Sequence, residues 1–256
     1  SQSDSVAVSS ASCKCKIFVV GEASFQIWFS PATFAGTKLE AKPQTIATAA
    51  TYFHRFFQEC SPDDYDFYLV AATAMYLAGK VEEDSLKIRD VVNVFHKCSF
   101  PLSDPLPLGE EYWCLRDSIV QTELLMLRVL EFRLSVDHPH RYLLHYLRSL
   151  NDWLGPLTCG GGGGARSGPP CQIPLAQVAW SLLCDMYLQP SCLCYPPQEL
   201  AVAVIQVALL AYDVRVPHGE DGVLSWYETF CENLSREKLA DLVMDVIQVY
   251  DGEGQQ

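Results

Sequence analysis

The chain has 256 residues, of which 49% are apolar, a mean hydropathy of +0.08 and a formal net charge of −13. This length and apolar content suffice for a sizeable core, so we expect a globular protein. The acidic balance opposes nucleic-acid binding, because affinity for phosphates depends on lysine and arginine. Apolar runs such as "FYLVAATAMYLAG" are shorter than the roughly 18 to 20 residues that span a bilayer. We therefore expect a protein partner, with no direct nucleic-acid contact and no membrane.

Helix-length periodic segments alternate with short breakers, and no run alternates as strands do, so the predicted fold class is all-α. Pro43 begins an amphipathic helix that should end near "CSPDD". Residues 64–80 are apolar on nearly every face, which is typical of a central helix. Another amphipathic helix is expected from about Ser85 to Lys97, capped by Asp84 or Ser85.

Further helices are predicted along the rest of the chain. A proline-rich loop leads to a long helix from about Glu111 to Phe132, and an amphipathic helix begins near Pro139. Helical periodicity then returns in four segments, at 175–188, 197–214, 226–231 and 236–250. About five helices thus precede the connector and about five follow it, which predicts a duplicated five-helix unit.

The boundaries of these units follow from composition. We place a disordered tail at 1–21, the first unit at 22–136, the second at 137–250 and a tail at 251–256. The glycine run in "GPLTCGGGGGARSGPP" predicts a flexible insert at about 155–174. Pro31 interrupts "FQIWFSPATFAGTKLE", which should supply the first helix, so that helix is expected to be broken or atypical.

Cysteines and histidines give no strong metal or catalytic signal. The 11 cysteines are an odd number, and most sit singly in apolar helical patterns, which predicts reduced thiols packed as small hydrophobes. The "CKC" and "CLC" pairs have no matching pair at zinc-site spacing. His138, His140 and His145 have no carboxylate or cysteine at ligand spacing, so we interpret them as packing or helix-start residues. We expect no catalytic residue, metal, cofactor or small-molecule ligand.

The stretch "MYLAGKVEED" poses a problem of charge, because the C-terminus of a helix disfavours the acids that follow Lys80. On a helical wheel, Glu123 falls on the apolar face of the long helix. A carboxylate there needs a partner, since burying it alone costs several kcal/mol. Lys80 is the candidate. The two can form a patch that hydrogen-bonds the backbone of an incoming segment, or an ordinary ion pair with Glu82 and Glu83 solvated.

The succession "LVAATAMYLAGKVEED", "LKIRDVVNVFHK" and "YWCLRDSIVQTELLMLRVLEFRLSVDHPHRYLLHYL" closely resembles the cyclin box of cyclins that activate cyclin-dependent kinases. The likeness covers about Ala35 to Tyr250 without the glycine-rich insert, and is strongest from Tyr65 to Leu150. It implies a cyclin fold with two tandem five-helix cyclin boxes. It also implies a heterodimer with a cyclin-dependent protein kinase.

The resemblance also implies a site. The hallmark of the family is a lysine that ends the third helix and a glutamate in the fifth, which grip the backbone before the mobile αC helix of the kinase while apolar side chains receive that helix. The matching kinase-binding positions are Lys80, Glu123, Leu77, Val81, Glu82, Leu127 and Phe132. The implied protein is a non-catalytic activating subunit that stabilises the active αC placement, and the chemistry belongs to the kinase.

Two alternatives stay open at this point. One is a transcription factor that shares the duplicated cyclin fold and binds DNA, which the acidity opposes. The other is a helical scaffold without kinase activation, which the presence of both Lys80 and Glu123 argues against. The N-terminal sequence lacks a secretory pattern and no basic nuclear-localisation run is evident, so we expect an intracellular protein of the nucleus, the cytoplasm or both.

Overall fold

The computed structural model describes residues 32–102, 104, 106–154, 174–214, 216, 225–232 and 234–251. The predicted tail at 1–21, residues 22–31 with Pro31 and the glycine-rich insert up to residue 173 lie outside this range. Of the predicted tail at 251–256, only Asp251, which is helical, lies inside this range. Within it every regular element is helical, which confirms the all-α class. No helix in these ranges is both long and apolar enough to cross a membrane.

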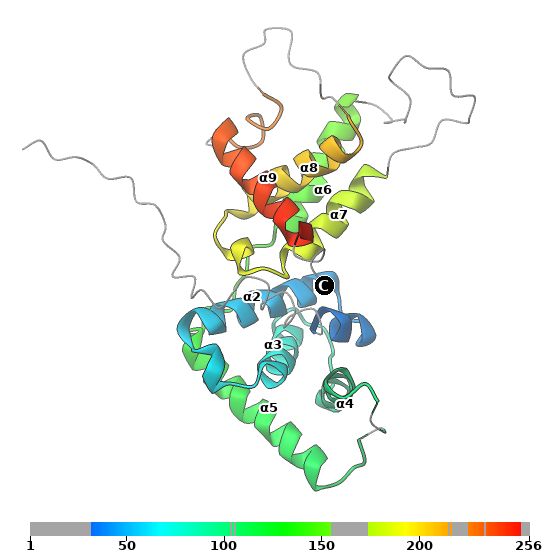
Figure 1. The fold of residues 1–256 in the computed structure, drawn as a ribbon, viewed down its shortest axis with the longest axis vertical. Helices are drawn as coiled ribbons and strands as arrows, with labels where there is room; N and C mark the ends of the chain where they lie inside the picture. The colour runs from blue at the N-terminus through cyan, green and yellow to red at the C-terminus, as the bar shows by residue number, and fades with distance from the viewer. Residues whose placement is uncertain are drawn as a thin grey trace, which may run out of the picture.

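The first half of the chain is a bundle with α3 at its centre (Figure 1). Its elements are a helical stretch at 32–38, α2 (Pro43–Glu59), the short 3-10 helix η1 (Pro62–Asp64), α3 (Phe67–Val81), α4 (Ile88–Ser99) and α5 (Glu110–Val129). Helix α3 packs against α2, α4 and α5. This arrangement explains why α3 is apolar on nearly every face.

The second half repeats the plan around α8. Its elements are α6 (Pro139–Leu154), α7 (Leu175–Met186), the 3-10 helix η2 (Pro190–Leu193), α8 (Pro197–Ala211) and α9 (Arg236–Asp251). Helix α8 packs against α6, α7 and α9. The helix predicted at 226–231 is instead a run of turns, because so short a segment cannot offset the cost of helix nucleation.

The buried apolar residues form two cores, one in each half. The first includes Phe53 and Met75, and the second includes Ile205. Tyr187 and Cys192 follow α7 in the second half, yet they pack in the first core. The α7–α8 connection therefore docks on α2, the helix of the first half that faces the second half in Figure 1.

The loop after α3 departs from the prediction. The residue that precedes α4 is Lys87, whose side chain makes no capping bond, so the predicted cap by Asp84 or Ser85 is wrong. The Asp84 carboxylate instead accepts hydrogen bonds from the backbone N–H of Lys42 at 2.8 Å and from Thr45 Oγ1 at 2.9 Å. Helix α2 has no acid in its first turn. Asp84 thus caps α2 from across the bundle, at the helix end where negative charge is favourable.

The cysteines of the described residues are free thiols. Cys192 is buried and Cys184 is half-buried, and burial raises the pKa of Cys184 to about 11 and that of Cys192 to about 12. Cys184 behaves as the packed small hydrophobe that the sequence predicts, and Cys192 of the "CLC" pair is packed in the same way. Cys114 does not, because its position on α5 is exposed.

Candidate functional site

Lys80 and Glu123 form an ion pair where the end of α3 meets α5. Lys80 Nζ lies 2.6 Å from Glu123 Oε1 and 2.8 Å from Oε2. The ammonium also lies 4.2 Å from the centroid of the Tyr76 ring, a favourable cation–π distance. The side chain of Glu123 is 10% exposed and that of Lys80 is 49% exposed. The structure thus brings the pair together as the sequence predicts, with the carboxylate held inside and the ammonium presented to solvent.

The predicted apolar positions differ in their exposure. Leu77 is buried in the first core, so it supports α3 from inside and does not present a surface. Val81 and Leu127 are half-buried at the edge of the same core. Phe132 follows α5 with a positive φ of 59° and is 67% exposed. Phe132 and the outer parts of Val81 and Leu127 are therefore accessible to a partner.

Helix α5 carries further exposed apolar side chains that the sequence analysis did not single out. They are Trp113, Val120 and Leu124. At 100° per residue these three and Leu127 share one side of α5, next to Glu123. We call Trp113, Val120, Leu124 and Leu127 the α5 apolar row. Val120 and Leu124 are four positions apart, on a different side of α5 from the buried Ile119 and Met126. A helical wheel that included every apolar residue of α5 would have shown this second apolar side.

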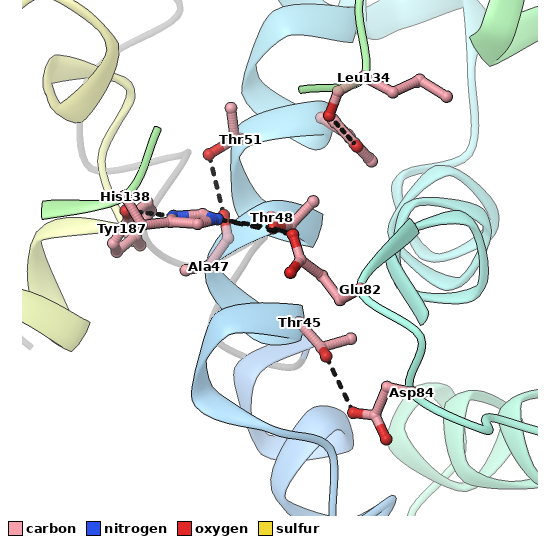
Figure 2. Close-up of polar contacts among 10 residues, drawn as sticks. Thr45, Ala47, Thr48, Thr51, Glu82, Asp84, Leu134, His138 and Tyr187 are labelled. Carbon is pink, nitrogen blue, oxygen red and sulfur yellow. Dashed lines mark hydrogen bonds and ion pairs between the residues drawn. The ribbon is translucent and has the colours of Figure 1, made fainter. Parts of the chain in front are cut away.

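Glu82 lies close to Lys80 in sequence, but its carboxylate turns toward α2. Thr48 Oγ1 donates a hydrogen bond to Glu82 Oε1 at 2.6 Å, and His138 Nε2 lies 3.8 Å from the same oxygen (Figure 2). The kinase-binding role that the resemblance assigns to Glu82 stays a prediction. The structure shows an internal role for this carboxylate.

The histidines near the connector serve packing and hydrogen bonding between the two halves. His138 Nε2 lies 2.8 Å from Thr48 Oγ1, and its Nδ1 lies 3.0 Å from the hydroxyl of Tyr187. His54 Nε2 bonds the carbonyl of Tyr187 at 2.8 Å. His140 stacks on the Tyr187 ring with an interplanar angle of 14°. Within the described ranges, no group of three or more metal-ligating side chains could hold a metal ion.

Burial lowers the pKa of all three of these buried histidines. The pKa falls to about 4 for His54 and for His140. For His138, burial lowers the pKa and the nearby Glu82 carboxylate opposes the change. Loss of hydration disfavours the charged imidazolium, so His54 and His140 are neutral at pH 7. Neutral, buried rings of this kind fit structural roles.

Comparisons with known proteins agree with the fold and the motifs. Residues 34–135 match the family model described as the cyclin N-terminal domain. The chain is 32% identical over 197 residues to Cyclin pch1 of Schizosaccharomyces pombe, covering 75% of this chain and 52% of that protein. It is 27% identical over 223 residues to Cyclin-K of Homo sapiens, covering 86% of this chain and 35% of that protein. The chain thus spans about half, or less, of the length of these relatives.

Solved structures show the same architecture. A chain of the yeast RNA Pol II CTD kinase CTDK-1 complex superposes with a TM-score of 0.66 at 15% identity, over 90% of this chain and 66% of that one. A chain of the CAK complex from Chaetomium thermophilum bound to ATP-gamma-S gives a TM-score of 0.63 at 15% identity, over 91% of this chain and 67% of that one. At such identities the likeness shows the fold alone. The domain match shows that residues 34–135 are a cyclin N-terminal domain, and the curated relatives extend the similarity to cyclins over most of the chain.

Proposed function

We propose that the chain is a non-catalytic activating subunit of a cyclin-dependent kinase. The observation that carries the proposal is the Lys80–Glu123 pair, whose half-exposed ammonium adjoins the α5 apolar row. An exposed apolar row beside a fixed polar pair suits the docking of an amphipathic helix. Kinship with proteins named as cyclins, and a fold shared with chains of kinase complexes, support the same reading.

The pair can act on the backbone at the start of such a helix. An ammonium has three N–H donors, and two of them are bonded to Glu123, which leaves one for a carbonyl of the incoming segment. The Glu123 oxygens can in turn accept a backbone N–H. The exposed side chains of Val120, Leu124 and Phe132 would then be covered by the apolar face of the kinase helix. Burying a fully exposed side chain of this kind contributes about 1.5–3 kcal/mol, and these partly exposed ones contribute a corresponding fraction.

Activation follows from differential binding. Phosphoryl transfer in protein kinases requires an ion pair between a lysine and a glutamate of the αC helix. A subunit that binds the active αC placement more tightly than the inactive one shifts the kinase population toward the active state. This chain would supply the docking surface, while the phosphoryl-transfer groups belong to the kinase. We place the complex inside the cell, in the nucleus or the cytoplasm.

The test is affinity purification of the tagged chain from cells, followed by identification of the associated kinase and assay of its activity on a protein substrate. Lys80→Ala or Glu123→Ala should lower kinase recovery at least about tenfold, because each leaves a docking charge without its partner. Helical content should not change. Unchanged recovery and activity with the double variant would contradict the assignment.

The second half of the chain offers a matched control. Lys238 Nζ lies 2.7 Å from Glu199 Oε1, and the side chains are 43% and 10% exposed, close to the values for Lys80 and Glu123. Lys238→Ala should therefore disturb a similar ion pair without lowering kinase recovery. A preparation that contains no kinase would favour a scaffold, and salt-dependent binding to duplex DNA would favour a transcription factor.

A further inference from the structure

We propose that Thr48 and His138 are positioning residues for Lys80, acting through a hydrogen-bond relay that runs from the second half of the chain to the end of α3. This inference rests on the proposed kinase-binding role of Lys80 and Glu123. The relay joins Tyr187, His138, Thr48 and Glu82 in that order, and Figure 2 shows them in line between the halves.

The bonds of the relay have a defined direction. Thr48 has one hydroxyl proton, and it donates that proton to Glu82 at 2.6 Å. His138 Nε2 must therefore carry the proton that bonds Thr48 at 2.8 Å. The other nitrogen of the neutral ring, Nδ1, then accepts from the hydroxyl of Tyr187 at 3.0 Å. All three hydrogen bonds are thus donated in the direction of Glu82. The proton position in each bond fixes the proton position in the next.

The relay ends two residues from Lys80. Glu82 is the C-cap residue of α3, and its backbone N–H still bonds the carbonyl of Ala78. The last turn of α3 is consequently held from two directions. Glu82 bonds α2, and Lys80 bonds Glu123 of α5. A turn that shifts toward either helix must change the position of the Lys80 ammonium.

Three of the four relay residues are buried and Glu82, the last, is half-buried, which favours one geometry of the hydrogen bonds. Thr48 is 0% exposed, Tyr187 7% and His138 9%. In a low-dielectric interior, a fully satisfied polar network favours one arrangement, whereas a partly satisfied one is costly. Because Tyr187 is also bonded to His54 through its carbonyl, its hydroxyl is presented by a fixed segment. The docking of the second half therefore contributes to the placement of the kinase-facing lysine.

Thr51 supplies a matched control on the same helix. It is a buried threonine one turn after Thr48, but its hydroxyl bonds the carbonyl of Ala47 within α2 at 2.9 Å (Figure 2). Thr48→Val and Thr51→Val each replace a buried hydroxyl by a methyl group. Thr48→Val breaks the relay, whereas Thr51→Val breaks a bond inside one helix. Thr48→Ser keeps the hydroxyl and tests rescue.

The first measurement is the dissociation constant of each full-length variant for one kinase, chosen as the tightest binder in a panel of purified cyclin-dependent kinases. Thr48→Val removes both hydrogen bonds of the Thr48 hydroxyl. It should weaken binding about five- to tenfold, about the effect of one buried hydrogen bond, because only part of the loss is transmitted to Lys80. Thr48→Ser and Thr51→Val should stay within about twofold of the parent chain. Tyr187→Phe, which removes the first hydroxyl of the relay, should weaken binding about threefold. Tyr187→Phe keeps the test decisive if Thr48→Val does not fold.

The second measurement is a double-mutant cycle with Lys80→Ala, which a general loss of stability would not move. If Thr48 acts through Lys80, the effect of Thr48→Val should shrink to less than about twofold in the Lys80→Ala background. An equal effect in both backgrounds would overturn the inference. A Thr48→Val effect no larger than that of Thr51→Val would also overturn the inference. In either case, a strong effect of Lys80→Ala on kinase binding would still support the proposed function. If Lys80→Ala itself has no effect, both proposals fail.

Discussion

Two of the three acids that follow Lys80 accept hydrogen bonds from α2 or from the residue that precedes it. Glu82 accepts a hydrogen bond from Thr48, and Asp84 accepts two at the start of α2. Glu83 occupies the turn between them with a positive φ of 51°. The C-terminus of α3 disfavours negative charge, but Asp84 lies at the N-terminus of α2, which favours it. The negative charge of Asp84 is therefore stabilised by the N-terminus of α2.

Removing this cap from α2 should lower stability. Asp84→Ala leaves the N–H of Lys42 and the hydroxyl of Thr45 without their acceptor, and should reduce the free energy of unfolding by about 1–2 kcal/mol. Urea denaturation at pH 7.5 measures the change. Asp117→Ala is the control, because Asp117 pairs with the adjacent Arg116 away from the ends of α5 and should contribute less than about 0.5 kcal/mol. Equal losses would contradict the capping role.

The buried histidines predict acid sensitivity. His54 and His140 have folded pKa values of about 4, below the value of about 6.5 in an unfolded chain. The unfolded state therefore binds more protons between these values, and stability must fall as the pH drops from about 6.5 toward 4. Each histidine can account for up to about 3 kcal/mol of that loss.

His140→Phe isolates one of these histidines. Within the described part of the chain neither ring nitrogen of His140 has a hydrogen-bond partner, so phenylalanine loses no such bond and keeps the aromatic stacking on Tyr187. Stability at pH 7.5 should stay within about 1 kcal/mol of the parent. At pH 5 the variant should lose about 2 kcal/mol less than the parent does. Urea denaturation at both pH values tests this, and a parallel loss in the two proteins would refute it.

At the scale of a secondary-structure element, α5 has two apolar sides. One side, which includes Ile119 and Met126, is buried in the first core. The other is the α5 apolar row, which is exposed except for the half-buried Leu127, and Glu123 lies between the two sides. A helix of this kind packs into the core of its own bundle on one side and presents an apolar surface to solvent on the other. This explains why a wheel drawn for one apolar face located Glu123 but not Leu124.

The α5 apolar row should tolerate a charge in the free chain but not in the complex. Leu124 is 56% exposed, so Leu124→Arg should change the free energy of unfolding by less than about 0.5 kcal/mol. Kinase affinity should fall at least about tenfold, because the arginine would have to be buried against the docked helix. Leu210→Arg on α8, where the leucine is 59% exposed, is the control. Surface plasmon resonance measures both, and a similar fall for Leu210→Arg would remove the row from the site.

At the scale of the whole molecule, the two halves are joined by more than the connector before α6. Tyr187 packs in the first core, bonds His54 and His138, and stacks on His140. Its covalent neighbours belong to the second half. One side chain thus links the cores, and the halves should unfold as a single cooperative unit.

Tyr187→Ala should uncouple the halves. Deleting a buried aromatic side chain costs about 3–5 kcal/mol, and here the loss falls on the contact between the cores. Differential scanning calorimetry should show one transition for the parent chain and two for the variant. Tyr146→Ala is the control, because Tyr146 is equally buried but packs inside the second core. It should lower the melting temperature and leave a single transition. Two transitions for Tyr146→Ala as well would contradict the special role of Tyr187.

Local pattern was enough to locate the long helices and the central ion pair, but it wrongly predicted a helix at 226–231. Prolines marked the starts of α2, α6 and α8, and the 3.6-residue period located the core faces, because both signals act within a few turns of chain. The wheel position of Glu123 and the family resemblance paired it with Lys80, and the structure shows that pair. The kinase-binding role itself remains a prediction.

The tertiary structure decided what depends on residues far apart in sequence. Glu82 and Asp84 bond threonines of α2 that lie 34 and 39 positions earlier, so no local pattern could reveal that they bridge two helices. Leu124 is exposed because no other helix of the bundle covers that side of α5 among the described residues. The position of Tyr187 in the first core depends on how the two halves pack against each other. The sequence by itself determined most of the helical segments, though not the turns at 226–231, and which charge needed a partner. The three-dimensional packing decided which of the remaining charges face inward, because a hydrogen bond depends on distance in space.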